Sequence, residues 1–178
     1  MARVSLIEEK DHPELAELIA KMRGARRGSL INVYRLLLHS PTLAATWFEH
    51  LNAVRWKTQL DGKLRELVII RIGILNRVDY VVRSHVPKLA LAEGLTLEQC
   101  DALAAWRDSS LYTEAQRAAL AYADAMTQAA AVPDAMHAEL VRHFSERQIV
   151  ELAVLVGTYN MHTRVFAALR IDPEPAQG

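Results

Sequence analysis

Apolar residues recur every three to four positions along most of this chain, a spacing that is typical of amphipathic α-helices. Runs that alternate apolar and polar residues, as half-buried strands do, are absent from the sequence. The pattern therefore predicts an all-α protein with about eight or nine helices. The predicted helices cover residues 13–23, 30–39, 41–57, 62–76, 79–93, 96–106, 113–130, 134–143 and 146–170.

Several helix ends carry explicit sequence signals. Thr96, Thr113 and Ser145 are each followed three residues later by a glutamine, which is the spacing of a capping box. Asp61 precedes the helix predicted at 62–76 and is expected to be its N-cap. Gly94 is expected to end the helix predicted at 79–93 as its C′ glycine. These positions fix the predicted helix boundaries more firmly than periodicity does.

Two segments are expected to depart from regular helix. Pro87 lies inside the helix predicted at 79–93, where it removes a backbone donor and crowds the preceding turn, so we expect a kink there. The C-terminal segment 171–178, IDPEPAQG, is expected to fray, because polar and proline-rich termini usually lack packing contacts.

The composition describes an ordinary globular chain. Its 178 residues are 51% hydrophobic, which is enough for one sizeable core and predicts a single domain over residues 1–178. The 21 basic and 21 acidic residues balance, so no charged surface for nucleic acid or anionic membranes is expected. No apolar run reaches the roughly 18 residues of a membrane span, and the acidic N-terminal segment does not resemble a signal peptide. The sequence thus predicts a cytoplasmic protein.

The chemistry available to this chain is restricted. Cys100 is the one cysteine, which excludes an intrachain disulfide and a self-contained dithiol redox cycle. No two of the seven histidines have the helical spacing of metal ligands, and no glycine-rich phosphate loop occurs. An active site is therefore expected to use carboxylate, imidazole and guanidinium groups, with no metal and no cofactor.

Glu66 is the first candidate for such chemistry. It lies in the segment 64–75, LRELVIIRIGIL, whose apolar residues surround the helix and predict that most of it is buried. A buried carboxylate must either find a cation or take up a proton. Two interpretations stay open: a raised pKa that suits a general acid or base, or an ion pair with an arginine such as Arg65, Arg71 or one from another helix.

His85 is the second candidate. In the segment 76–85, Val78, Val81, Val82 and His85 fall on adjoining faces, so the imidazole is expected to lie against apolar side chains. A histidine in such surroundings is either a proton-transfer group or a core residue whose hydrogen bonds are satisfied.

A third polar feature lies near the C-terminus. Glu151, Thr158 and His162 fall within roughly 20° of one line along the helix predicted at 146–170. A polar line on an apolar helix predicts a hydrogen-bonded network in the core or a contact between subunits.

The segment 60–103 combines an arginine–glutamate pair, a long apolar helix, Asn76, Tyr80, His85 and the sequence AEGLTLEQCDAL. It resembles the core motif region of the carboxymuconolactone decarboxylase and alkylhydroperoxidase D (AhpD-like) superfamily. The resemblance implies an all-helical AhpD-like domain that forms oligomers. In the redox, peroxiredoxin-like branch of that superfamily a glutamate precedes Cys-x-x-Cys, and a histidine follows the second cysteine by four residues. Glu66 and His85 match that glutamate and that histidine.

Both cysteine positions of the redox branch are valines here, Val78 and Val81. A valine carries no thiolate, so the resemblance does not imply thiol peroxidase activity. Relatives in the decarboxylase-like branch often have Glu-Trp where this chain has Val81 and Val82, so their usual acidic residue is missing as well.

Two functions follow from this combination. The first is a cofactor-free lyase or isomerase that acts on a small organic acid, with Glu66 and His85 as its proton-transfer pair. Arg71 is a further candidate for holding a substrate carboxylate. The residues expected to contact the substrate are Asn76, Val78, Tyr80, Val81 and Arg83.

The second function is a non-catalytic or redox-accessory oligomer that binds an apolar small molecule beside Val78 and Val81. Under either function a homo-oligomer is expected, because the segments 64–75 and 149–157 are apolar nearly all round and need extensive cover.

Overall fold

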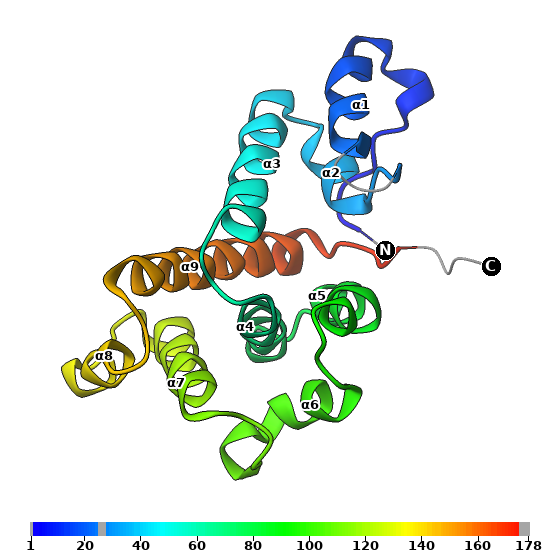
Figure 1. Ribbon diagram of the computed structural model, residues 1–178. Coiled ribbons are helices and arrows are strands. Elements are labelled where there is room, and N and C mark those ends of the chain that lie inside the picture. Colours follow the sequence, from blue (N-terminus) through cyan, green and yellow to red (C-terminus); the bar gives the residue numbers. More distant parts are fainter. Residues whose placement is uncertain (1, 25–27, 175–178) are drawn as a thin grey trace. The chain divides into compact units, whose positions relative to one another are not determined.

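The computed structural model describes residues 2–24 and 28–174, and every regular element in these ranges is a helix (Figure 1). The predicted all-α fold class is confirmed. Contacts divide the chain into two compact units: residues 1–53 together with 166–178, and residues 54–165. That the whole chain acts as a single domain stays a prediction.

The helix bounds follow the sequence signals closely. Each predicted start lies within three residues of an observed one. The α-helices are α1 (Ala16–Gly24), α2 (Asn32–Leu37), α3 (Pro41–Trp56), α4 (Gly62–Leu75), α5 (Asp79–His85), α6 (Leu97–Ala102), α7 (Glu114–Ala129), α8 (Asp134–Val141) and α9 (Glu146–Leu169). Short 3-10 turns occupy Glu9–Asp11, Pro13–Leu15 and Leu103–Asp108. Among the helices that the structure describes, none is long and apolar enough to cross a membrane.

Side-chain capping explains why the starts were predictable. All three capping boxes form, with Thr96, Thr113 and Ser145 each exchanging two hydrogen bonds of 3.0–3.3 Å with the glutamine three residues on. Asp61 caps α4 by accepting a hydrogen bond from the backbone N–H of Leu64 at 3.1 Å. These contacts depend on near neighbours in the sequence, so sequence spacing is sufficient to predict them.

The helix predicted over 79–93 is disturbed at Pro87, as expected, and the disturbance is a π-helical turn. The α-helix ends at His85, and Val86–Ala90 form a π-helical turn that contains Pro87. Proline lacks the N–H that an α-helix needs and crowds the preceding turn, and the wider π turn accommodates both effects. The segment ends at Gly94, whose positive φ of 85° is the left-handed conformation expected of a C′ glycine. The π turn begins directly after His85, the last residue of α5.

The unit formed by residues 1–53 and 166–178 has its own small core. Tyr34 and Phe48 pack edge to face with ring centroids 5.5 Å apart. The Asn32 amide donates hydrogen bonds to the carbonyl oxygens of Asp172 and Pro173 at 3.2 and 3.1 Å. The prediction that the tail frays is therefore wrong for residues 171–174, and residues 175–178 lie outside the described ranges.

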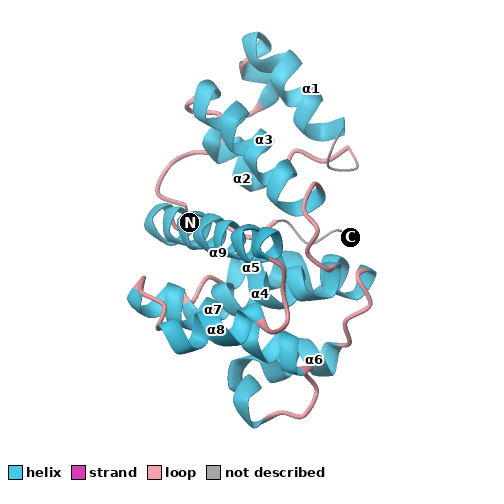
Figure 2. Ribbon diagram, turned by 60° about the vertical axis from the view of Figure 1, so that its left-hand side comes forward, coloured by secondary structure: helices cyan, strands magenta, loops and turns pink. Residues whose placement is uncertain are grey.

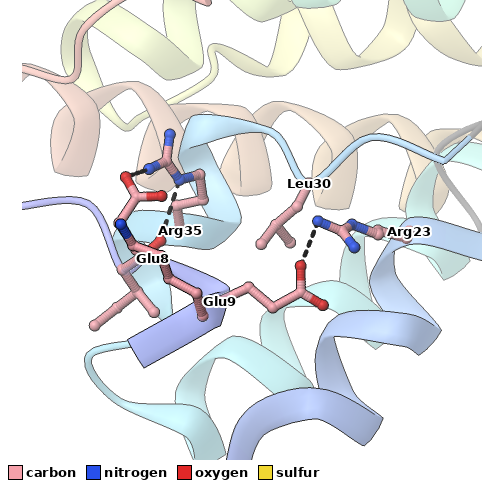
Figure 3. A pocket seen from close by; sticks show the side chains of 7 residues that line it. Glu8, Glu9, Arg23, Leu30 and Arg35 are labelled. Atoms are coloured by element: carbon pink, nitrogen blue, oxygen red, sulfur yellow. Dashed lines mark hydrogen bonds and ion pairs between the residues drawn. The ribbon is translucent and has the colours of Figure 1, made fainter. Parts of the chain in front are cut away.

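This unit also contains a cavity of about 320 Å³, shown in Figure 3. Its lining residues are Ile7, Glu8, Glu9, Lys10, Arg23, Leu30 and Arg35. Arg23 pairs with Glu9 at 2.5 Å, and Arg35 pairs with Glu8. The charges of both arginines are therefore offset by glutamates of the same lining.

The unit formed by residues 54–165 is built around α4. Every residue of α4 from Leu64 to Gly73 is buried, as its all-round apolar pattern predicts. Helices α5 and α7 flank it, as Figures 1 and 2 show. A Cβ on Gly73 would lie only 3.2 Å from the Val81 side chain, so this glycine allows α5 to approach α4 closely. The close approach brings the side chains of the two helices together.

A buried carboxylate joins α4 to α7 and to the turn at Leu103–Asp108. Asp124 on α7 accepts two hydrogen bonds from Arg71 on α4, at 2.7 and 3.0 Å. It also accepts hydrogen bonds from Trp106 at 3.2 Å and from Arg107 at 2.6 Å. Fork-like pairing of this kind is the strong form of the arginine–carboxylate interaction. Arg71 is thereby occupied by a structural contact.

We expect Asp124→Ala to destabilise the protein by about 3–5 kcal/mol, because it leaves the buried Arg71 guanidinium uncompensated. The exposed Asp101, on α6, provides a control of the same substitution, Asp101→Ala, with an expected effect within about 0.5 kcal/mol. Urea unfolding followed by far-ultraviolet circular dichroism measures both. Equal effects of the two substitutions would contradict the role assigned to Asp124.

Candidate functional site

Glu66 and His85 contact each other directly. Nδ1 of His85 lies 2.6 Å from Oε2 of Glu66, and the two residues are 7% and 0% exposed. Glu66 projects from α4, and His85 is the last residue of α5. The structure therefore brings together the two residues that the sequence proposed as a pair, although they are 19 positions apart.

Two arginines face the other oxygen of the Glu66 carboxylate. Nη2 of Arg55, near the end of α3, lies 3.2 Å from Oε1, and Nε of Arg65 lies 3.5 Å from the same atom. Both arginine side chains are buried, with 4% and 7% of their surface exposed. Glu66 thus lies among three groups that donate hydrogen bonds or carry positive charge.

These partners decide the protonation state of Glu66. Burial is the largest single influence and by itself would raise the pKa of Glu66. The hydrogen bond and charge of His85, followed by the charges of Arg55 and Arg65, together outweigh burial. They lower the pKa of Glu66 to about 2. The interpretation of Glu66 as a carboxyl group with a raised pKa is therefore wrong, and the ion-pair interpretation is correct. The sequence analysis named Arg65 and Arg71 as possible partners of Glu66. Arg65 does face Glu66, whereas Arg71 binds Asp124.

The ionised state of Glu66 fixes the position of a proton on His85. An ionised carboxylate has no hydrogen to donate, so Nδ1 of His85 must donate the 2.6 Å hydrogen bond. The pair has the arrangement in which a carboxylate orients an imidazole and stabilises its charged form.

Aromatic rings extend the site toward α9. The rings of His85 and Tyr159 meet nearly at right angles, with centroids 5.7 Å apart and an interplanar angle of 82°. The ring of His162 lies 5.5 Å from that of Tyr159, and all three side chains are buried. Such edge contacts favour particular ring orientations, so Tyr159 helps to set the plane of His85.

Glu151, the first residue of the predicted polar line on α9, contacts residues outside that line. Glu151 accepts a hydrogen bond from the backbone N–H of Gln59 at 2.7 Å and another from Arg147 at 2.9 Å. Its carboxylate therefore binds the segment before α4 and a neighbour on its own helix, whereas Thr158 and His162 are buried farther along α9. Glu151 lies about two helical turns from Thr158 and about three from His162, so its carboxylate finds partners near its own end of α9. The network or subunit contact expected of this line stays a prediction.

Asn76, proposed from the sequence to bind substrate, is engaged in packing. Its amide nitrogen donates to Oδ1 of Asn160 at 3.0 Å and to Oγ1 of Thr163 at 2.8 Å. The Asn160 amide in turn donates to Oγ1 of Thr127 at 2.9 Å. These contacts link the end of α4 to α9 and α7.

The other proposed substrate contacts are distributed between the core and the surface. Val78, Tyr80 and Val81 are buried, and Val81 packs on Gly73 as described above. Arg83 is exposed, and among the described residues it forms no ion pair with Asp79 or Glu66. The structure thus gives positions for these residues, and their substrate-binding role stays a prediction.

Cys100 is buried in the apolar core of the unit formed by residues 54–165. It is 4% exposed and belongs to a cluster that includes Leu67, Leu103 and Trp106. Burial, together with the negative charges of Asp101 and Glu66, raises the pKa of its thiol. A thiol with a raised pKa forms little of the reactive thiolate.

Sequence reasoning missed three residues of the site: Arg55, Tyr159 and Glu93. Arg55 lies eleven positions before Glu66, and Tyr159 comes from a distant helix, so no local spacing pointed to either. Glu93 binds Nη2 of Arg65 at 2.6 Å. Within the described ranges, no group of three or more histidine, cysteine, aspartate or glutamate side chains is arranged to hold a metal ion.

Residues 41–125 match the carboxymuconolactone decarboxylase family, and this match contains Glu66 and His85. Uncharacterized protein YnjA of Escherichia coli (strain K12) is 34% identical to this chain over 125 residues, which are 70% of this chain and 66% of YnjA. The chain thus spans slightly less than two thirds of the length of that relative.

Solved structures share the fold. A protein of unknown function from Agrobacterium tumefaciens, assigned to the antioxidant defence protein AhpD, has a TM-score of 0.74 at 29% identity, covering 79% of this chain and 96% of that one. A peroxidase-related protein with an alkylhydroperoxidase AhpD core from Ralstonia eutropha JMP134 has a TM-score of 0.84 at 21% identity, covering 97% and 92%. At 21% identity, the likeness to the Ralstonia eutropha protein shows the fold alone. Residues 41–125 thus belong to the carboxymuconolactone decarboxylase family, and the chain has an AhpD-like fold.

Proposed function

We propose that this protein is a cofactor-free lyase or isomerase that moves a proton to or from a small organic acid and works as a homo-oligomer. The observation that carries the proposal is the 2.6 Å hydrogen bond between His85 Nδ1 and an ionised, buried Glu66. A carboxylate that stays ionised does not exchange protons near neutral pH, whereas an imidazole does. In this proposal His85 is the acid and base, and Glu66 orients it.

The chemistry needs one group that accepts and returns a proton. An isomerase removes a proton from a carbon beside a carbonyl and returns it to another carbon, whereas a decarboxylating lyase leaves an enolate that takes up a proton on carbon. In both cases the proton passes through Nε2 of His85. Protonated His85 is stabilised by the negative charge of Glu66. Glu66 shares that charge with Arg55 and Arg65, which also contact its carboxylate.

A second candidate is a non-catalytic or redox-accessory oligomer that binds an apolar small molecule. The apolar side chains at both positions where the redox branch has cysteines favour it. Val81, however, packs closely on Gly73, and both Val78 and Val81 are buried, which gives an apolar ligand little surface there. The Glu66–His85 pair has no role in this candidate, so variants of the pair distinguish the two.

We expect the protein to exchange hydrogen for deuterium at the carbon beside the carbonyl of a small keto acid or lactone acid, as followed by proton NMR in D₂O. His85→Gln should lower the rate by about 10²–10⁴-fold, because the amide cannot act as acid or base. His143, a half-buried histidine that pairs with Glu139, offers the control His143→Gln, which should leave the rate unchanged. Exchange by His85→Gln at the parental rate would rule out the proposed role.

The depressed pKa of Glu66 predicts a pH dependence of stability. The pKa of Glu66 is about 2 in the folded protein, against an ordinary value of 4.5. Between these two pH values the folded protein therefore binds fewer protons than the unfolded protein. The stabilisation from Glu66 is therefore present above pH 4.5 and is lost as the pH falls from 4.5 toward 2. Its size is on the order of 3 kcal/mol. Urea unfolding of the parent should show this loss, and Glu66→Gln should show a shallower dependence over the same window. Identical slopes would contradict the ionised state assigned to Glu66.

Cys100 is expected to take no part in catalysis. The purified protein should show no dithiol-dependent reduction of organic peroxide, and Cys100→Ser should match the parent in the deuterium-exchange assay, because the thiol is buried and its pKa is raised. A peroxidase assay coupled to dithiothreitol oxidation measures the first point. Peroxide turnover that disappears in Cys100→Ser would overturn this expectation.

A further inference from the structure

Arg65 joins an inner carboxylate to an outer one. Its Nε faces Glu66 at 3.5 Å, and its Nη2 binds Glu93 at 2.6 Å. The side chain of Arg65 is 7% exposed, whereas that of Glu93 is 32% exposed. Glu93 is thus the solvent-side partner of a buried guanidinium group.

Trp56 holds the same guanidinium from another direction. The Cζ atom of Arg65 lies 5.0 Å from the centroid of the indole ring, and that of Arg55 lies 4.6 Å from it. Trp56 is nevertheless 52% exposed, a large fraction for a tryptophan. Arg65 is therefore positioned by Trp56 and Glu66 whether or not Glu93 stays in place.

Glu93 provides the outer partner of the Arg65 guanidinium, whose Nη2 atom faces the Glu93 carboxylate at 2.6 Å. A buried guanidinium that loses its carboxylate partner is destabilised unless another anion takes the same position. Another carboxylate at Nη2 would make the contact that Glu93 makes now.

We propose that Arg65 and Trp56 form the binding site for the carboxylate of a small planar organic acid, which replaces Glu93 at Nη2 of Arg65. This inference rests on the proposed function in taking a small organic acid as the ligand. The ligand carboxylate accepts the hydrogen bond that Glu93 now accepts, and its planar body lies against the exposed indole of Trp56.

Glu93 is suited to being replaced. It is partly exposed, so its carboxylate regains water when it leaves, and the incoming carboxylate takes its place as the partner of Arg65. Its position also depends on Gly62 at the start of α4, because a Cβ on Gly62 would collide with the Glu93 carboxylate. Gly62→Ala therefore displaces Glu93 without changing any charge.

Benzoate is the test ligand, and benzamide is its uncharged counterpart. Binding is measured by proton–nitrogen NMR at the indole N–H of Trp56, assigned with Trp56→Phe. We expect benzoate to shift this signal and benzamide not to do so. Glu93→Gln should bind benzoate about tenfold more tightly than the parent, and Gly62→Ala should also bind it more tightly.

Two further variants complete the experiment. Glu98 is exposed on α6, so Glu98→Gln makes the same charge change as Glu93→Gln and should leave benzoate affinity unchanged. Arg65→Gln should abolish binding. Equal affinities of Glu93→Gln and Glu98→Gln, equal binding of benzamide and benzoate, or no binding by Glu93→Gln would each overturn the proposal. Because no turnover is measured, benzoate binding by a protein that exchanges no deuterium would leave this site standing and remove the proposed function.

Discussion

A carboxylate in the apolar interior of α4 is the constraint on which the rest of this unit depends. Glu66 is completely buried, and an ionised carboxylate without partners is too costly to keep in such a place. Its compensation comes from α3, α4 and α5 through Arg55, Arg65 and His85. The last turn of α3, helix α4 and helix α5 must therefore keep these side chains in contact for Glu66 to stay ionised. The close approach of α5 at Gly73 and the break after His85 serve the same geometry.

The sequence was informative wherever a contact joins residues that are close along the chain. Capping pairs such as Thr113 with Gln116, the cap at Asp61 and the left-handed Gly94 all depend on neighbours within a few positions. The helix predicted over 79–93 continues past His85 to Ala92, but periodicity does not show that the chain accommodates its proline with a π turn. Pro87 marked the place of the disturbance, but the π turn is a property of the folded backbone.

The candidate site was less predictable, because its decisive contacts are distant in sequence. Glu66 and His85 were paired through resemblance to a family, whereas Arg55 and Tyr159 carried no comparable signal. The direction of the Glu66 pKa stayed open between two interpretations for the same reason. Burial is visible in an apolar sequence pattern and raises a carboxyl pKa, while the opposing cations become visible only when other helices pack.

The physical cost of the arrangement supports a functional role for it. Buried ion pairs seldom improve stability over well-packed apolar residues of similar size, because desolvation offsets much of the attraction. Apolar side chains at positions 66, 55 and 85 would fill the same space without the cost of burying charge, as the buried Val78 and Val81 do nearby. Thiol chemistry does not account for the pair in this chain, since the one cysteine is buried and has a raised pKa. A carboxylate that is kept ionised and hydrogen-bonded to an imidazole is, however, what proton transfer at His85 requires.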